Sequence, residues 1–171
     1  TSGTLALSNA SSAPASFSVT SSSIASGATL QANGAQTIGL GAISLAGTGS
    51  LNVTAGTATG HVVASGGSGT SQILVTGGAA NFSSIAVQST NDLAAVVSGG
   101  ASMTVSGASS VNAGHTFSVS GAGSISMGGG TIAGTFNDTA SLINLSGSLT
   151  VQSTGSATVT SLTLQPAVNI T

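Results

Sequence analysis

Four side chains in this 171-residue sequence carry a group that could act as an acid, a base or a metal ligand. They are the carboxylates Asp92 and Asp138 and the imidazoles His61 and His115, and the chain has no Lys, Arg or Cys. Two carboxylates that flank a sugar can hydrolyse a glycosidic bond. Each Asp directly follows an Asn, however, and such pairs are typical of turns. We therefore interpret both carboxylates as turn residues and predict that the protein is not an enzyme.

The same four side chains lack the spacing of a metal site. Zinc takes three or four ligands, whereas these two His and two Asp are spread between positions 61 and 138. His61 and His115 each follow a glycine, a context that predicts the entrance to a strand. The sequence contains no Gly-Lys-Ser/Thr phosphate loop. We expect no metal and no cofactor, and no nucleic-acid binding, because the chain has no Lys or Arg to neutralise phosphate.

Asparagine offers a site of modification. Asn-x-Ser/Thr, the acceptor sequence for N-glycosylation, occurs at six of the nine asparagines. Sugars there would supply a hydrophilic coat that the composition lacks. The alternative interpretation places these side chains in turns or in ladders of stacked Asn. The six are Asn9, Asn52, Asn81, Asn137, Asn144 and Asn169.

Charge is almost absent from the sequence as a whole. Charged residues make up 1% of the chain, against about 25% in an ordinary soluble domain. Aromatic residues make up 2% and hydrophobic residues 40%. This inventory predicts a thin core made of many similar layers of small side chains. Disorder is the rival interpretation, but regularly recurring Val, Ile and Leu with only two prolines argue against it.

Short strands separated by glycine-containing turns are visible along most of the chain. Apolar and small polar residues alternate with period two, the pattern of a strand with one buried face. The expected strands follow one another at about eleven residues, within the spacing typical of repetitive all-β folds. The stretch 132–145 is less clear, and no helix is expected. Examples of the alternation lie at 4–8, 51–53, 103–105, 117–119 and 149–151.

Two all-β folds fit this spacing. In a parallel β-solenoid, small or β-branched side chains stack on their equivalents in neighbouring coils. With two or three strands per coil of roughly 22–33 residues and a rise of about 4.8 Å, the rod would be about 25–40 Å long. The alternative is a β-sandwich filament subunit with donor-strand exchange, in which segment 4–8 completes a neighbour's sheet. Sandwich cores use large aromatics, so only four Phe favour the solenoid.

The repeated segments also resemble a known family. LNVTAG (51–56), SMTVSGA (102–108), TFSVSGA (116–122) and SISMGGG (124–130) share one pattern. Longer runs of the chain resemble the Gly/Ser/Thr/Asn-rich β-solenoid repeats of bacterial autotransporter passengers and filamentous-haemagglutinin-like surface proteins. These runs are TLALSNASS (4–12), SMTVSGASSVNAG (102–114), TFSVSGAGSISMGGGTIAG (116–134) and SLTVQSTGSATVTSLTLQ (148–165). This resemblance implies secretion, display at the cell surface, and a role in adhesion or in building a fibre or surface layer.

The lack of charge also predicts self-association. Sheet edges in soluble proteins are commonly guarded by charges, and solenoid ends by polar caps. We therefore expect a structural subunit of an extracellular filament, fibre or surface layer, whose partners are copies of itself. Backbone hydrogen bonds and small-side-chain packing would hold such a polymer together. The alternative is a cell-surface adhesin that binds carbohydrate, such as a surface polysaccharide, or the surface of a host or neighbouring cell.

No membrane insertion is expected from the sequence. Its longest run of bulky apolar residues, 93–97, has about five members, whereas a spanning helix needs about 20. Nor does the N-terminus resemble a signal peptide. Residues 1–171 are expected to form a single repetitive β domain, either a whole filament subunit or a segment of a longer chain.

Overall fold

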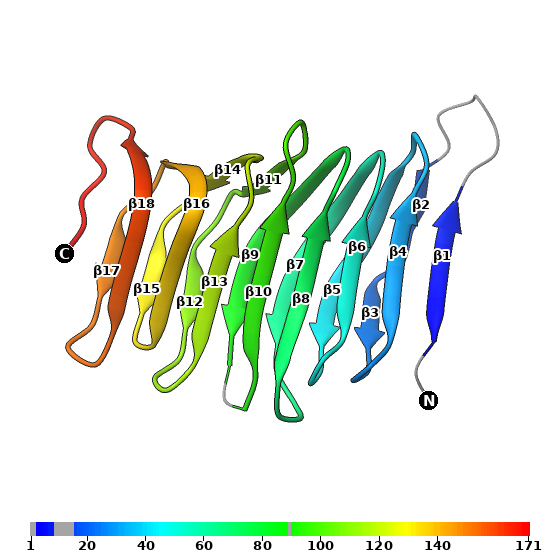
Figure 1. Ribbon diagram of the computed structural model, residues 1–171, viewed down its shortest axis with the longest axis horizontal. Helices are drawn as coiled ribbons and strands as arrows, with labels where there is room; N and C mark the ends of the chain where they lie inside the picture. Colours follow the sequence, from blue (N-terminus) through cyan, green and yellow to red (C-terminus); the bar gives the residue numbers. More distant parts are fainter. Residues whose placement is uncertain (1–2, 9–15, 89) are drawn as a thin grey trace.

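Every regular element in the described structure is a β-strand. The computed structural model describes residues 3–8, 16–88 and 90–171, and only the backbone of residues 140 and 141. Its 18 strands form one continuous sheet wound into a rod, with β1 and β18 at opposite ends (Figure 1). The strands are β1 (Thr4–Ser8), β2 (Ser16–Ser18), β3 (Ser21–Ile24), β4 (Thr29–Asn33), β5 (Thr37–Leu45), β6 (Ser50–Val53), β7 (Thr57–Ala64), β8 (Thr70–Val75), β9 (Ala79–Val87), β10 (Asp92–Val97), β11 (Ser102–Val105), β12 (Ser109–Val111), β13 (Thr116–Ser120), β14 (Ser124–Met127), β15 (Gly130–Ile132), β16 (Thr135–Leu145), β17 (Leu149–Val151) and β18 (Ser156–Leu164).

All pairings between these strands are parallel, which makes the fold a β-solenoid of about seven turns. The solenoid prediction is confirmed. The β-sandwich alternative is wrong, because a sandwich is built from antiparallel neighbours. The described residues contain no helix long and apolar enough to cross a membrane.

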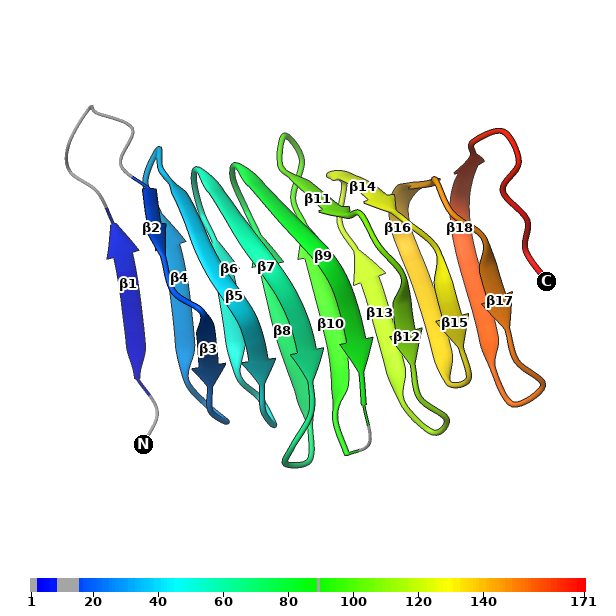
Figure 2. The same cartoon turned by 180° about the vertical axis from the view of Figure 1, so that it is seen from behind.

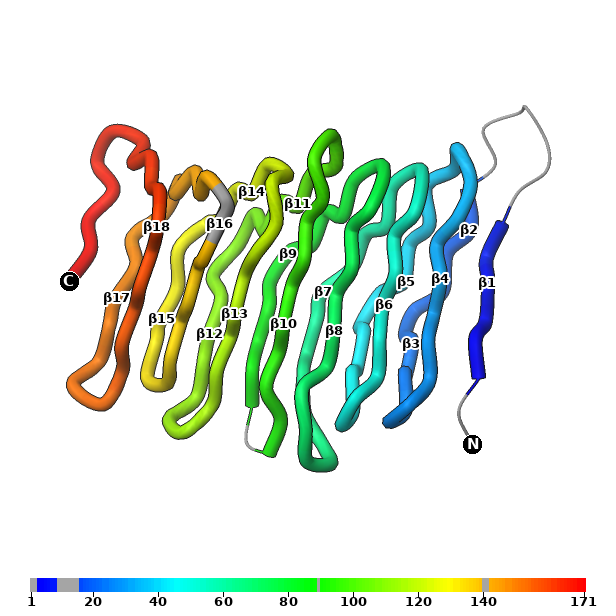
Figure 3. The backbone as a smooth tube through the Cα atoms, in the orientation of Figure 1, coloured from blue at the N-terminus to red at the C-terminus, as the bar shows by residue number. Residues whose placement is uncertain are grey.

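The chain winds around three faces. Face A holds β1, β4, β6, β8, β10, β13 and the first parts of β16 and β18. Face B holds β2, β11, β14, the first parts of β5, β7 and β9, and the second parts of β16 and β18. Face C holds β3, β12, β15, β17 and the second parts of β5, β7 and β9. Several strands therefore bend from one face to the next without a separate turn (Figure 3).

The coils lie at the short end of the expected range, because several strands run over these corners. Leu30 pairs with Leu51, 21 residues on, and Leu51 pairs with Ile73, 22 residues on. The shortest step on face A joins Ser118 to Asn137, 19 residues apart. From β1 to β18 seven such steps, each of about 4.8 Å, give a rod of about 34 Å.

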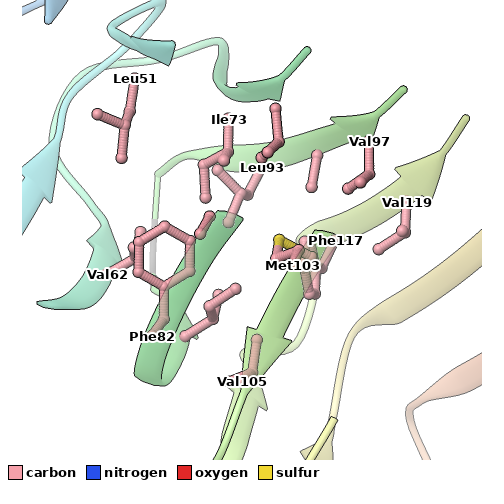
Figure 4. Close-up of a cluster of buried hydrophobic side chains, with 14 of the residues drawn as sticks. Leu51, Val62, Ile73, Phe82, Leu93, Val97, Met103, Val105, Phe117 and Val119 are labelled. Carbon is pink, nitrogen blue, oxygen red and sulfur yellow. The ribbon is translucent and has the colours of Figure 1, made fainter. Parts of the chain in front are cut away.

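Stacked inward side chains form the core. On face A, Leu51 and Ile73 are fully buried at equivalent positions, and Val53 stacks on Val75 in the same way. Figure 4 shows these aliphatic layers together with Phe82 and Phe117. A narrow core of this kind needs no Trp or Tyr, since each layer spans only the width of one coil.

The sequence pattern missed three short strands and left one long strand unclear. β3, β12 and β15 have three or four residues each and read SSSI, SSV and GTI, so they lack the alternation used to recognise strands. Pairing with neighbouring coils holds them extended. The unclear stretch 132–145 contains β16, which at 11 residues is the longest strand. Ile170 pairs with Leu149 only in an isolated bridge outside the named strands.

Candidate assembly interface

The N-terminal end of the solenoid exposes core side chains. In the described structure β1 pairs with β4, while β2 and β3 each pair with β5, so the first coil is hydrogen-bonded on one side only. Leu5 on β1 is 61% exposed and Phe17 on β2 is 44% exposed. They line an open cavity of about 540 Å³ together with Val19, Ile24 and Leu30. In inner coils the equivalent positions are buried by the next coil.

The C-terminal end has the same character. β18 pairs with β16 and carries Leu164, 46% exposed, at its last position. Ile170 bridges to Leu149 on face C and is 47% exposed. The ends thus display unpaired strand edges and apolar side chains of the type that fills the core between coils.

Neither end carries a charged side chain among its described residues. The two carboxylates of the sequence, Asp92 and Asp138, belong to β10 and β16. Charged side chains and polar caps are what usually prevent strand edges from pairing with another molecule. The two ends therefore fit a further parallel coil and offer no electrostatic barrier to it.

Asp92 and His115 lie together where consecutive coils enter face A. His115 Nδ1 is 3.4 Å from Asp92 Oδ1, which also accepts a hydrogen bond from the Thr116 backbone N–H at 2.9 Å. His115 Nε2 accepts a hydrogen bond from the Thr90 N–H at 3.1 Å. Because Nε2 already accepts this bond, the ring is not poised as a general base. The pair joins neighbouring coils, and His115 directly precedes β13, as expected for a residue at a strand entrance.

The turn interpretation is wrong for Asp138. It lies inside β16, is 1% exposed, and stacks in register between Val119 and Val159. Its Oδ2 accepts a hydrogen bond from the Thr160 N–H at 3.3 Å, and its backbone oxygen accepts one from the Thr160 hydroxyl at 2.8 Å. The register between β16 and β18 breaks just after Asp138. A short carboxylate can reach the backbone N–H of the next coil at such a corner, which explains an acidic residue at an inward position.

His61 is also not where the sequence predicted it. It lies in the middle of β7, between Gly60 and Val62, where the register with β9 shifts, and not at a strand entrance. Its ring is half-buried on the outside of the rod. Among the described residues, no group of three or more His, Asp or Glu side chains is close enough to hold a metal ion.

Asn91 forms a buried polar network that the sequence did not reveal. Its Nδ2 donates to Ser71 Oγ at 2.7 Å and lies 3.4 Å from the Leu45 carbonyl oxygen, while Ser71 Oγ donates to the Gly47 carbonyl at 3.1 Å. Asn91 is 1% exposed. The Asn91 and Ser71 side chains therefore connect three consecutive coils.

Replacing Asn91 by alanine is expected to lower the free energy of unfolding by about 1–3 kcal/mol, because buried hydrogen bonds are lost. Its Oδ1 is buried without a hydrogen-bond partner, so the loss should fall toward the lower end of that range. Urea denaturation followed by circular dichroism measures the change. Asn33→Ala, at an exposed position of β4, is the control. Equal losses in the two variants would contradict this role for Asn91.

The six predicted glycosylation sites fall into three groups. Asn9 lies outside the described residues. Asn81 and Asn169 are exposed, and Asn52, Asn137 and Asn144 are half-buried. The four within strands occupy outward positions and stack on other residue types, as Asn81 does between Thr59 and Thr104. For these four, the alternative of turn residues or Asn-on-Asn ladders is wrong. Exposure favours Asn81 and Asn169 as acceptors.

The geometry defines a parallel β-solenoid whose described ends expose apolar side chains. Asp92, His115 and Asp138 form hydrogen bonds between neighbouring coils. Protein-family models, curated proteins and solved structures give no match to this chain. The fold and the residues described above therefore carry the functional argument.

Proposed function

We propose that this protein is a structural, non-enzymatic subunit that stacks end to end into an extracellular filament, fibre or surface layer. The observation that carries the proposal is that both ends expose core side chains and strand edges, with no charged side chain among their described residues. A further coil, whether from a second copy or from a longer polypeptide, would continue the same parallel ladder. The resemblance of the repeats to bacterial surface solenoids supports a location outside the cell or on its surface.

Burial at the ends would drive this assembly. Leu5, Phe17 and Leu164 would each leave water when another coil covers them, and burial of such a side chain stabilises by about 1.5–3 kcal/mol. New backbone hydrogen bonds would form along three faces at once. With no Lys or Arg in the sequence, salt should have little effect on the contact.

Lysine substitutions at each end test the proposal. Leu5→Lys and Leu164→Lys each place a charge on an exposed apolar position, so the monomer should still fold while stacking at that end is blocked. Gln72→Lys adds the same charge to an exposed position on the side of the rod, on β8, and serves as the control. Sedimentation velocity should show long polymers for the unsubstituted chain and for Gln72→Lys, and monomers for either end variant.

Mixing the two end variants gives the sharper result. Head-to-tail stacking joins a C-terminal end to an N-terminal end, and is heterologous. Leu5→Lys keeps a free C-terminal end and Leu164→Lys a free N-terminal end, so an equimolar mixture should form one-to-one dimers and nothing longer. Dimers in either variant alone would indicate head-to-head or tail-to-tail contact. Polymers in all samples would refute stacking through the ends.

A further inference from the structure

A shallow groove of about 600 Å³ runs along the side of the rod, from Thr20 in the first coil to Ser106. Thr, Ser, Asn and His side chains line it together with small residues. It crosses β5, β7, β9 and β11 where faces B and C meet. Figure 2 shows the ribbons of these four strands. Its volume is within the range of pockets that bind small molecules or parts of polymers. The stacking proposed above does not use this surface.

Two rows of outward side chains form the groove's walls. The first row is Thr59, Asn81 and Thr104, which pair directly in consecutive coils. The next residues that line the groove follow the inward positions Gly60, Phe82 and Val105 along the same strands. They form the second row, which is His61, Ser83 and Ser106.

The backbone departs from regular pairing on the floor of the groove. The register of β5 with β7 shifts between Gly39 and Ala42, and that of β7 with β9 shifts between Gly60 and Val62. Irregularities of this kind bend a strand and redirect the neighbouring side chains. Gly41 has a φ of +59° and sits so close to the Thr20 carbonyl that a Cβ would collide with it. Gly41 therefore has no side chain that could fill the groove at this end.

The walls offer hydrogen-bonding groups of both kinds and no permanent charge. Ser83 Oγ donates to the Gly60 carbonyl and Ser106 Oγ to the Phe82 carbonyl, each at 3.4 Å, which leaves oxygen lone pairs as acceptors. The Asn81 amide and the His61 ring can donate as well as accept. The sequence has no Lys or Arg to pair with a carboxylate, sulfate or phosphate. Phe82 is 1% exposed, so its ring provides no stacking platform.

We propose that this groove binds a neutral, hydroxyl-rich glycan chain lying along the axis of the rod. Hydrogen-bonding side chains of the first row recur at about 4.8 Å from coil to coil, which suits a polymer whose hydroxyls also recur at regular intervals. Recognition by hydrogen bonds alone, in competition with water, gives weak binding with a Kd on the order of 1 mM. Repeated copies along an assembled rod would strengthen attachment through multivalency.

Isothermal titration calorimetry of the Leu5→Lys variant tests this inference. This variant keeps the groove, and it stays monomeric if the stacking proposal is right. The probes are neutral oligosaccharides of glucose, mannose and galactose, with dextran sulfate and an oligogalacturonate as anionic comparisons. At least one neutral probe should bind, and the anionic probes should not. Replacing both Asn81 and His61 by alanine should weaken binding by about tenfold or more. Asn144→Ala, which continues the first row two coils beyond Thr104 and outside the groove, should leave binding unchanged.

Three outcomes would overturn the inference: no binding by any neutral probe, tighter binding of the anionic probes, or equal losses in the groove variant and in Asn144→Ala. Circular dichroism checks that all variants are folded. A sugar attached to Asn81 itself would fill the groove with the same chemistry, so the protein is made in a host without N-glycosylation and its unmodified mass is verified. Binding and stacking are read separately, because a folded Leu5→Lys variant that still polymerises fails only the stacking proposal.

Discussion

Replacing Phe117 by alanine is expected to lower the free energy of unfolding by about 3–5 kcal/mol, the cost of removing a large side chain from a packed core. Phe117 is fully buried on β13, and its ring meets that of Phe136 edge-on, with centroids 5.5 Å apart and planes at 61°. Its deletion would remove this contact and leave a cavity in the core of the rod. The surrounding strands cannot move inward to fill this cavity, because hydrogen bonds fix the spacing between coils.

Phe17→Ala is the matched control for that substitution. Phe17 occupies the end coil and is 44% exposed, so its truncation should change the stability of the monomer by no more than about 1 kcal/mol. Chemical denaturation of both variants, followed by circular dichroism at concentrations below assembly, gives the comparison. Similar losses of unfolding free energy in the two variants would contradict this dependence of stability on burial.

Gly121→Ala is expected to have the second large effect, about 3 kcal/mol or more. Gly121 has a φ of +102°, and a Cβ at this position would collide with the Val97 carbonyl oxygen of the preceding coil and lie 2.8 Å from its carbon. Left-handed backbone costs a residue with a Cβ about 1–2 kcal/mol, and overpacking adds about 1–3 kcal/mol. Neither cost can be relieved without separating two coils at this corner.

Two neighbouring glycines separate those contributions. Gly100 also has a positive φ, of +82°, but a Cβ there would have no neighbour within 4 Å, so Gly100→Ala should show the strain of about 1–2 kcal/mol alone. Gly99 has open space and no positive φ, and Gly99→Ala should be neutral or slightly stabilising. The midpoints of thermal unfolding should therefore fall in the order Gly99, Gly100, Gly121. The reverse order would contradict the close approach of coils described here.

The sequence was sufficient for the fold class because the relevant signal is repeated in every coil. Alternation such as that of Leu51-Asn52-Val53 marks a strand with one buried face, and the shortage of aromatics distinguishes a thin solenoid core from a sandwich. Strands without alternation, such as β3 and β15, could not be recognised, since their conformation comes from pairing with residues about 20 positions away. Coil lengths fell at the short end of the expected range because some strands run over the corners. β16, for example, bends across two faces between Asp138 and Leu142, where the sequence has no Gly or Pro to mark the corner.

The functional surfaces were less accessible to sequence reasoning. The context of Asp138 is that of a turn residue, and its burial follows only from the corner that β16 makes in three dimensions. Nothing in the local sequence distinguishes Asn81, whose side chain is in the groove, from Asn144, which occupies the same kind of position outside it. Both assignments depend on which coils stack, and stacking is a property of the whole rod.

The central claim is that this solenoid assembles end to end, and fibre diffraction from oriented, purified protein tests it most directly. Stacking predicts long unbranched rods in negative-stain images that persist in high salt. Their diffraction should show a meridional reflection at about 4.8 Å, because the strands lie across the rod axis and the coils repeat along it. Dispersed particles about 34 Å long in dilute buffer, with no polymer at any concentration tested, would contradict the account.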